Sequence, residues 1–188
     1  LVIDAMKNCE QTKGLSVLDH GISVKNYLFD LINHLRNGDT LKYEWVLPDW
    51  LYTNKDLILS SLPDDSTLDL YTTYHDIGKP FCLTIDSDGK RHFPNHAEVS
   101  YTIFKQIFNN DVAAELIRHD MDIHLLKSDG VDDFCKNPFS LTLLLTGLAE
   151  VHSNAQIFGG LDSTSFKIKN KSINQRSKQI LNKIKNNK

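Results

Sequence analysis

Apolar residues recur at steps of three and four between residues 24 and 35, and this period strongly constrains the fold. The apolar positions are Val24, Tyr27, Leu28, Leu31, Ile32 and Leu35. Such spacing places side chains on one face of an α-helix, and the pair Asn37-Gly38 is a typical helix stop. The sequence therefore predicts a helix from about His20 to Arg36.

The rest of the chain also favours helix over strand. In the run 81–93, apolar and polar residues alternate around Asp88-Gly89, a pattern that predicts a short β-hairpin. Asn137-Pro138 supplies an N-cap and a first-turn proline. Further helices are expected at about 66–75, 95–109, 110–120 and 138–158, with a short one at 55–61 inside the less regular segment 39–65. The predicted fold class is mostly α, a helical bundle with one short β-hairpin.

Length and composition fit one main domain. The chain has 188 residues, of which 40% are hydrophobic, so it can bury a substantial core. We expect a domain over residues 1–165, followed by a basic C-terminal helix or tail over 166–188. Three widely separated cysteines do not suggest disulfides, and no apolar run approaches the length of a membrane span. A cytoplasmic protein without membrane contact is predicted, and its oligomeric state is left undetermined.

Charge is unevenly distributed along the chain. Residues 166–188 contain eight basic and no acidic residues. Because the whole chain carries −3 and this segment +8, residues 1–165 carry −11. Two interpretations stay open: contact with a polyanion such as RNA or DNA, or a solvated helix face. Ser172 and Gln175 resemble a capping box, and Ile173, Ile180, Leu181 and Ile184 form an apolar stripe.

The segment Tyr74-His75-Asp76-Ile77-Gly78-Lys79-Pro80 carries the clearest chemistry. Imidazole and carboxylate are both good ligands for a divalent metal, and here they are adjacent at the predicted end of a helix. Other histidines occur in or beside predicted helices, namely His20, His96, His119 and His152. Together they indicate a metal site.

The stretch HDIGKPFCLTIDSDGKRHFPNHAEVS, residues 75–100, resembles the HD-domain family of metal-dependent phosphohydrolases. It is most similar to the HD domains associated with tRNA nucleotidyltransferases, and the resemblance covers about residues 15–158. It implies an HD-domain-like helical bundle that binds one or two divalent metals, drawn from Mn, Fe, Zn, Ni, Co and Mg. The imidazole-rich ligand set favours Zn, Mn and Fe among these.

The resemblance also implies roles for individual residues. His20, His75 and Asp76 match metal ligands, and His96 and His119 match the additional histidines that accompany a second metal. Asp76 and Lys79 are the implied catalytic residues, with Lys79 near the substrate phosphate. His34, His92 and His124 are predicted not to be ligands, and a thiol nucleophile at Cys82 is not favoured.

His152 departs from the family pattern, which closes its ligand set with an Asp in this helix. Imidazole can replace carboxylate as a ligand, so His152 is a candidate sixth ligand. It also flanks the apolar run Leu141 to Leu148, where a hydrogen-bonded core histidine is an equal alternative. Both interpretations stay open at this point.

The implied function is hydrolysis of a phosphate on a nucleotide or an RNA end, either a phosphomonoester or a 2′,3′-cyclic phosphodiester. Phosphate esters are anionic, so a metal is needed to neutralise their oxygens and to activate water. The alternative is a catalytically impaired HD-fold module that binds nucleic acid or regulates a partner. That alternative rests on the Asp-to-His departure at His152.

Overall fold

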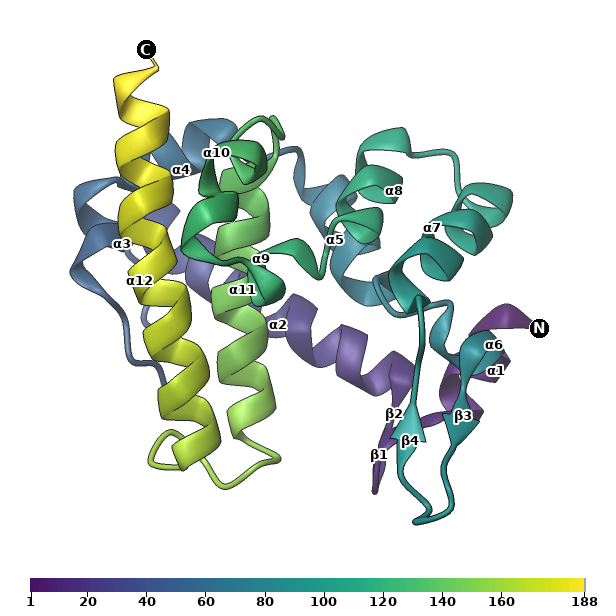
Figure 1. The fold of residues 1–188 in the computed structure, drawn as a ribbon. Coiled ribbons are helices and arrows are strands. Elements are labelled where there is room, and N and C mark those ends of the chain that lie inside the picture. Colours follow the sequence, from purple (N-terminus) through teal and green to yellow (C-terminus); the bar gives the residue numbers. More distant parts are fainter. Residues whose placement is uncertain (188) are drawn as a thin grey trace. The chain divides into compact units, whose positions relative to one another are not determined.

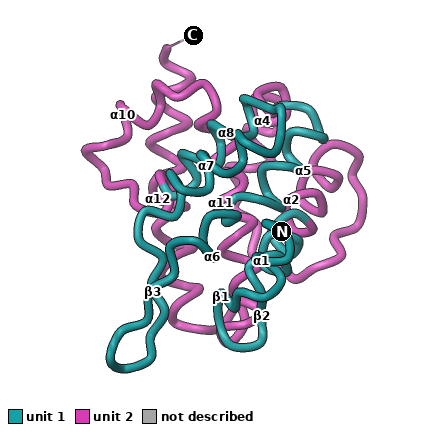
Figure 2. The backbone as a smooth tube through the Cα atoms, turned by 90° about the vertical axis from the view of Figure 1, so that its right-hand side faces the viewer, with its two compact units in different colours: residues 1–25, 63–121 teal, residues 26–62, 122–188 magenta. Residues whose placement is uncertain are grey.

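The computed structural model describes residues 1–187 and is built mainly from α-helices, as the sequence predicted (Figure 1). The chain forms two compact units, each assembled from two separate stretches of sequence (Figure 2). The first unit comprises residues 1–25 and 63–121, and the second comprises residues 26–62 and 122–188. None of the helices formed by residues 1–187 is both long enough and apolar enough to cross a membrane.

The first unit contains the helices that surround the His-Asp segment. Their bounds are α1 (Val2–Asn8), α5 (Asp65–Tyr74), α6 (Lys79–Cys82), α7 (His96–Ile107) and α8 (Asp111–Arg118), and α2 (Val17–Asn37) begins in this unit. α8 packs against α5 and α7, and Leu68, Phe104 and Ile117 are fully buried in this unit. The helices predicted at 66–75, 95–109 and 110–120 are confirmed to within a few residues.

Side-chain caps fix where α5 and α8 begin. The carboxylate of Asp64 accepts the N–H of Thr67 at 2.7 Å, and the side-chain oxygen of Asn110 accepts the N–H of Ala113 at 2.9 Å. The amide of Asn110 also donates to the hydroxyl of Thr67 at 3.0 Å. The two helix starts are therefore tied together.

Two short antiparallel pairs accompany these helices. β3 (Thr84–Ile85) and β4 (Arg91–His92) form the predicted hairpin, with Gly89 at φ 75° in its turn. The hairpin is shorter than predicted because Phe81 and Cys82 belong to α6. The pair β1 (Glu10–Thr12) and β2 (Leu15–Ser16) was not predicted, because two- and three-residue strands carry too little periodicity to detect.

The second unit is a group of helices around α11. Its elements are α3 (Asp49–Thr53), α4 (Lys55–Ser61), α9 (Asp122–Leu125), η1 (Ser128–Gly130), α10 (Val131–Phe134), α11 (Ser140–Ala155) and α12 (Thr164–Asn186). α11 is almost wholly buried, and α12 lies along it (Figure 1). α12 buries Phe166, Ile173 and Ile180. The basic segment thus contributes apolar side chains to the core of this unit.

α12 also begins earlier than the capping-box prediction placed it. The hydroxyl of Ser163 accepts the N–H of Phe166 at 3.1 Å, which makes Ser163 the N-cap. Ser172 and Gln175 lie inside the helix, so the prediction of a capping box there was wrong. A serine followed three residues later by glutamine occurs both at the start of a helix and inside one, so this pattern alone does not locate the N-cap.

The irregular segment before α3 is held by a buried carboxylate. Asp30 accepts the N–H groups of Lys42 and Tyr43 at 2.9 and 3.2 Å, and the indole N–H of Trp45 at 2.9 Å. The ring of Tyr43 stacks on Tyr27 of α2 at 4.2 Å between centroids. Segment 39–48 is therefore irregular in backbone yet fixed within the second unit.

Candidate metal centre

The turn after α5 directs two polar side chains into the interior of the first unit. Its backbone is closed by hydrogen bonds from Ile77 N–H to the Tyr74 carbonyl at 3.0 Å and from Lys79 N–H to the Asp76 carbonyl at 2.9 Å. Ile77 is fully buried and anchors the turn. As a result His75 and Asp76 are each only 2% exposed.

Two glycines allow neighbouring helices to approach this turn closely. A Cβ on Gly21 would lie 2.1 Å from the Thr73 carbonyl oxygen, so only glycine lets α2 pass the end of α5 at this distance. A Cβ on Gly78 would lie 2.5 Å from the backbone nitrogen of Ser100 in α7. These approaches bring His20 of α2 and His96 of α7 to the His-Asp turn.

Three imidazole rings converge on the single carboxylate of Asp76. The Nε2 atoms of His75 and His20 lie 3.2 and 3.6 Å from Asp76 Oδ2. The Nε2 atom of His96 lies 3.5 Å from Asp76 Oδ1. The ligand atoms of His20, His75 and Asp76 are all within 4.8 Å of one another.

The hydrogen bonds of these rings show which nitrogen faces the carboxylate as an acceptor. His75 donates its Nδ1–H to the Thr72 carbonyl at 2.7 Å, and His96 donates its Nδ1–H to the Phe93 carbonyl at 3.1 Å. In a neutral imidazole the Nε2 atom then carries the lone pair. A nitrogen lone pair and a carboxylate at this distance need a proton or a metal between them, and imidazole with carboxylate is a donor set that fits a divalent metal.

Asp76 stays ionised in spite of its burial. Burial alone would raise the pKa of this carboxyl, but the charges of His75 and Lys79, a hydrogen bond from His75 and the charge of His20 hold the pKa well below its ordinary value. The centre therefore offers an anionic ligand at neutral pH.

Lys79 is held at the edge of this centre. Its Nζ lies 2.8 Å from Asp76 Oδ2 and donates to Gln11 Oε1 at 3.1 Å, and it lies 5.2 Å from the centroid of the Phe93 ring. With three such neighbours, the ammonium group has a defined position beside the carboxylate. It can place a positive charge next to a bound anion.

His119 does not join the predicted ligands. It follows α8, its side chain is 39% exposed, and its Nε2 lies 3.8 Å from the Glu115 carboxylate. Among residues 1–187, the buried group with ligand atoms within 4.8 Å contains His20, His75 and Asp76 but not His119. His96 is likewise outside this group, although its Nε2 lies 3.5 Å from Asp76 Oδ1.

Asp120, the next residue, was missed by the sequence analysis and lies nearer the centre. It is buried, and its Oδ1 accepts the hydroxyl of Tyr71 at 2.5 Å. One of its carboxylate oxygens lies within 4.8 Å of a ring nitrogen of His75. The signal was present in the sequence, since His119-Asp120 repeats the His75-Asp76 pattern at the end of an amphipathic helix.

His152 has a different setting, inside the second unit. It is fully buried, donates its Nδ1–H to the Leu148 carbonyl at 2.8 Å, and accepts the N–H of Val46 on Nε2 at 3.1 Å. Burial lowers the pKa of its imidazole below the ordinary value. Both ring nitrogens are engaged with backbone groups, which is the setting that the core interpretation of His152 describes.

The residues that were set aside have other neighbours. His34 bonds to the Asp39 carbonyl and the Tyr52 hydroxyl, His92 to Asp86, and His124 to Glu150. Burial raises the pKa of the Cys82 thiol, which makes it a poor nucleophile at neutral pH.

Comparison with known protein families gives one result. A family model described as HD domain matches residues 30–159, which is more than half of the chain. No curated protein and no solved structure in the comparison matches the chain. The matched range contains His75, Asp76, His96 and Asp120, whereas His20 precedes it.

Proposed function

The chain belongs to the HD domain family, whose members are in general metal-dependent hydrolases of phosphate compounds, and on this premise we propose that it hydrolyses a phosphate ester on a nucleotide or an RNA end. The observation that carries the proposal is the convergence of three imidazole Nε2 atoms on the buried, ionised carboxylate of Asp76. Three imidazole nitrogens and one carboxylate held this close together are the ligand types that bind a divalent cation of the transition series.

The metal would be held by His20, His75, Asp76 and His96. Because three of these four ligands are imidazoles, the ligand set favours Zn, Mn, Fe, Co or Ni over Mg. When bound, a divalent metal neutralises phosphate oxygens and lowers the pKa of a coordinated water towards neutrality. The carbonyls of Thr72 and Phe93 orient the two rings by accepting their Nδ1–H groups. These carbonyls thereby keep Nε2 as the liganding atom.

Lys79 and Asp120 supply the remaining chemistry in this proposal. The Lys79 ammonium, fixed between Asp76 and Gln11, would stabilise the charge that builds up on a phosphate in the transition state. Asp120 would be the carboxylate that was expected at position 152, either completing the ligand set or accepting a proton from the attacking water. Tyr71 holds Asp120 in place through its hydroxyl.

The basic charge of residues 166–188 supports a nucleic-acid or nucleotide substrate, because an anionic substrate is drawn to positive charge. The alternative of an impaired module rested on the loss of a carboxylate at position 152. His152 hydrogen-bonds to backbone groups of the second unit and Asp120 lies near His75, and both observations favour the enzyme over this alternative.

The proposal is tested by comparing wild-type protein with Asp76→Asn, an uncharged variant of the same shape. We expect the wild type to retain a transition metal after purification and to hydrolyse bis-p-nitrophenyl phosphate. Asp76→Asn should lose the metal and about 10³-fold in hydrolysis, since several kcal/mol of charge stabilisation are removed. A panel of nucleoside monophosphates, 2′,3′-cyclic nucleotides and 3′-phosphorylated RNA then identifies the substrate. Equal metal content in both proteins would refute the site.

A further inference from the structure

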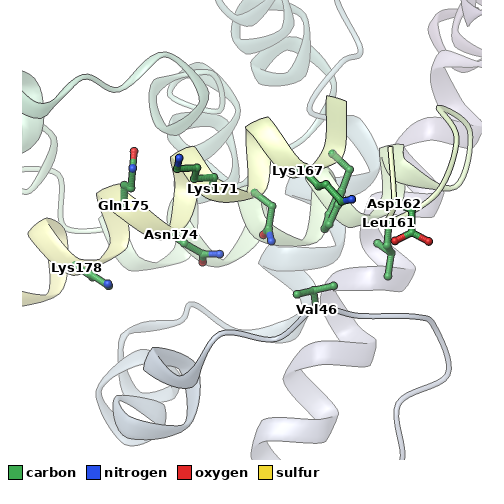
Figure 3. Close-up of a pocket in the computed structure, with 10 residues that line it drawn as sticks. Val46, Leu161, Asp162, Lys167, Lys171, Asn174, Gln175 and Lys178 are labelled. Atoms are coloured by element: carbon green, nitrogen blue, oxygen red, sulfur yellow. The ribbon is translucent and has the colours of Figure 1, made fainter. Parts of the chain in front are cut away.

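A groove in the second unit combines positive charge with apolar surface, and it shares no residue with the candidate metal centre. It has a volume of about 580 Å³, within the range of ligand sites in proteins. One wall is a face of α12, and Val46 and Leu161 lie across from it (Figure 3). Its lining residues are Val46, Leu161, Asp162, Phe166, Lys167, Asn170, Lys171, Asn174, Gln175 and Lys178.

The lysines of the groove form a row along one side of α12. At 100° per residue, Lys167, Lys171 and Lys178 fall within about 40° of one another around the helix axis. None of these three has a carboxylate within 4.0 Å among residues 1–187, and all three are exposed. Asp162 is the single acidic residue that lines the groove. The row therefore presents a net positive charge to any ligand.

The length of this row favours an extended ligand over a single phosphate group. Lys167 and Lys178 are eleven residues apart, which is about 16 Å along an α-helix. A single phosphate is too small to contact both ends of such a row. Successive phosphates of a nucleic-acid strand lie at least about 3.4 Å apart along the strand, so a few nucleotides would span it.

The opposite wall and the floor suit bases and sugars. Val46 is 48% exposed although it is apolar, and it lies across the groove from α12. Asn170 and Asn174 supply amides between the lysines, and Asn170 Oδ1 is a buried acceptor to which residues 1–187 offer no donor. Grooves for single strands combine a basic track with surfaces on which bases rest. If the lysines were only a solvated helix face, an apolar surface at Val46 and Leu161 beside them would have no role.

Hydrogen bonds within the second unit keep the groove open without a ligand. Val46 is fixed by its N–H bond to His152, and the segment before it is fixed by Asp30. On the other wall, Trp50 donates its indole N–H to Asn174 Oδ1 at 3.0 Å. This bond orients the Asn174 amide so that its Nδ2 group can donate a hydrogen bond to a ligand. Little conformational entropy would be lost when a ligand enters.

We propose that this groove binds single-stranded nucleic acid of a few nucleotides. Lys167, Lys171 and Lys178 would contact phosphates, Asn170 and Asn174 would contact base or sugar edges, and Val46 with Leu161 would cover a base. RNA and DNA strands share this chemistry. The proposal does not depend on the hydrolysis proposed above, because the groove and the metal centre share no residue.

The test measures binding of fluorescein-labelled octanucleotides, U₈ and dT₈, to the full chain. Lys167→Gln/Lys178→Gln removes both ends of the row, while Lys169→Gln/Lys183→Gln removes the same charge from the opposite face of the same helix. We expect the first pair to weaken binding about tenfold, and the logarithmic salt slope to become shallower by about 1.4. The control pair should change affinity less than threefold.

Three results would overturn the proposal. The first is no binding of either octanucleotide to wild type at 50 mM salt, and the second is an equal loss in both double variants, which would indicate diffuse charge. The third is tighter binding of polyglutamate than of U₈, which would indicate an acidic protein partner. Because neither double variant touches the metal centre, metal content and bis-p-nitrophenyl phosphate hydrolysis report independently on the proposed function.

Discussion

His75 in the first unit and His152 in the second are both buried and make similar hydrogen bonds through Nδ1, but only His75 has a carboxylate beside Nε2. Each donates its Nδ1–H to a backbone carbonyl three or four residues earlier, at 2.7 and 2.8 Å. They differ in what faces Nε2. In His75 it is the carboxylate of Asp76 at 3.2 Å, and in His152 it is the N–H of Val46 at 3.1 Å.

The comparison teaches how to separate a ligand histidine from a core histidine. A backbone N–H satisfies the Nε2 lone pair, and a neutral imidazole then packs like any other buried ring, as His152 does between Trp45 and Phe166. A carboxylate cannot satisfy that lone pair, because both groups are acceptors. The setting of His75 therefore suits a cation, either a proton on Nε2 that is donated to Asp76 or a metal between the two groups, whereas Nε2 of His152 already accepts a backbone N–H.

The difference between the two histidines is tested most directly by placing the same side chain at both positions. His75→Gln should lose metal and about 10³-fold in phosphodiester hydrolysis, because a ligand is removed from a charged centre. His152→Gln keeps an acceptor for the Val46 N–H and should retain both properties. Elemental analysis and hydrolysis of bis-p-nitrophenyl phosphate measure the outcome. Loss of metal in both variants would return His152 to the ligand set.

Gly21 tests whether the first unit depends on the close approach of α2 to α5. Gly21→Ala places a Cβ 2.1 Å from the Thr73 carbonyl oxygen, so the backbone must shift. We expect a loss of about 2–3 kcal/mol in the free energy of unfolding and weaker metal binding, because His20 moves with its neighbour. Urea unfolding and metal titration are the measurements.

Gly130→Ala is the matched control for this substitution, since its Cβ would meet only the flexible end of Leu126 at 3.3 Å. It should change the free energy of unfolding by less than about 1 kcal/mol and leave metal affinity unaltered. A Gly21→Ala protein as stable as the control would show that α2 can withdraw from α5 without cost.

The smallest expected effect is a pH dependence of the second unit. The unfolded chain protonates His152 near pH 6.5, whereas burial holds the pKa of the folded imidazole lower. Below about pH 6.5 the unfolded state thus binds more protons, so the free energy of unfolding decreases as the pH is lowered, by at most about 1.4 kcal/mol per pH unit. His152→Gln should remove this part of the decline.

Urea unfolding of both proteins at pH 7.5, 6.5 and 5.5, with a chelator present, measures the difference. The chelator removes any contribution of a bound metal, which would otherwise add its own proton linkage. Parallel pH profiles for wild type and His152→Gln would mean that His152 is protonated in the folded state too.

Most of the helices could be predicted because their causes are local. The period of Val24 to Leu35 acts within a few turns of chain, so α2 was predicted. The helices α5 and α8 were also predicted to within a few residues, and the structure shows equally local caps for them at Asp64 and Asn110. The short strands β1 and β2 and the helices α3 and α9 to α10 were not found. Elements of two to five residues depend on packing for their stability and leave almost no periodic signal.

For the candidate centre, the sequence by itself determined the adjacent ligands of the His75-Asp76 step, the lysine one turn later at Lys79, and the family to which the chain belongs. Tertiary structure alone decided which of the distant residues reach them. Asp120 rather than His119 turns towards His75, because packing fixes which of two adjacent side chains at a helix end is buried. His152 looked equivalent in the sequence, and only the hydrogen bond from Val46, more than a hundred residues away in the chain, made it a core residue.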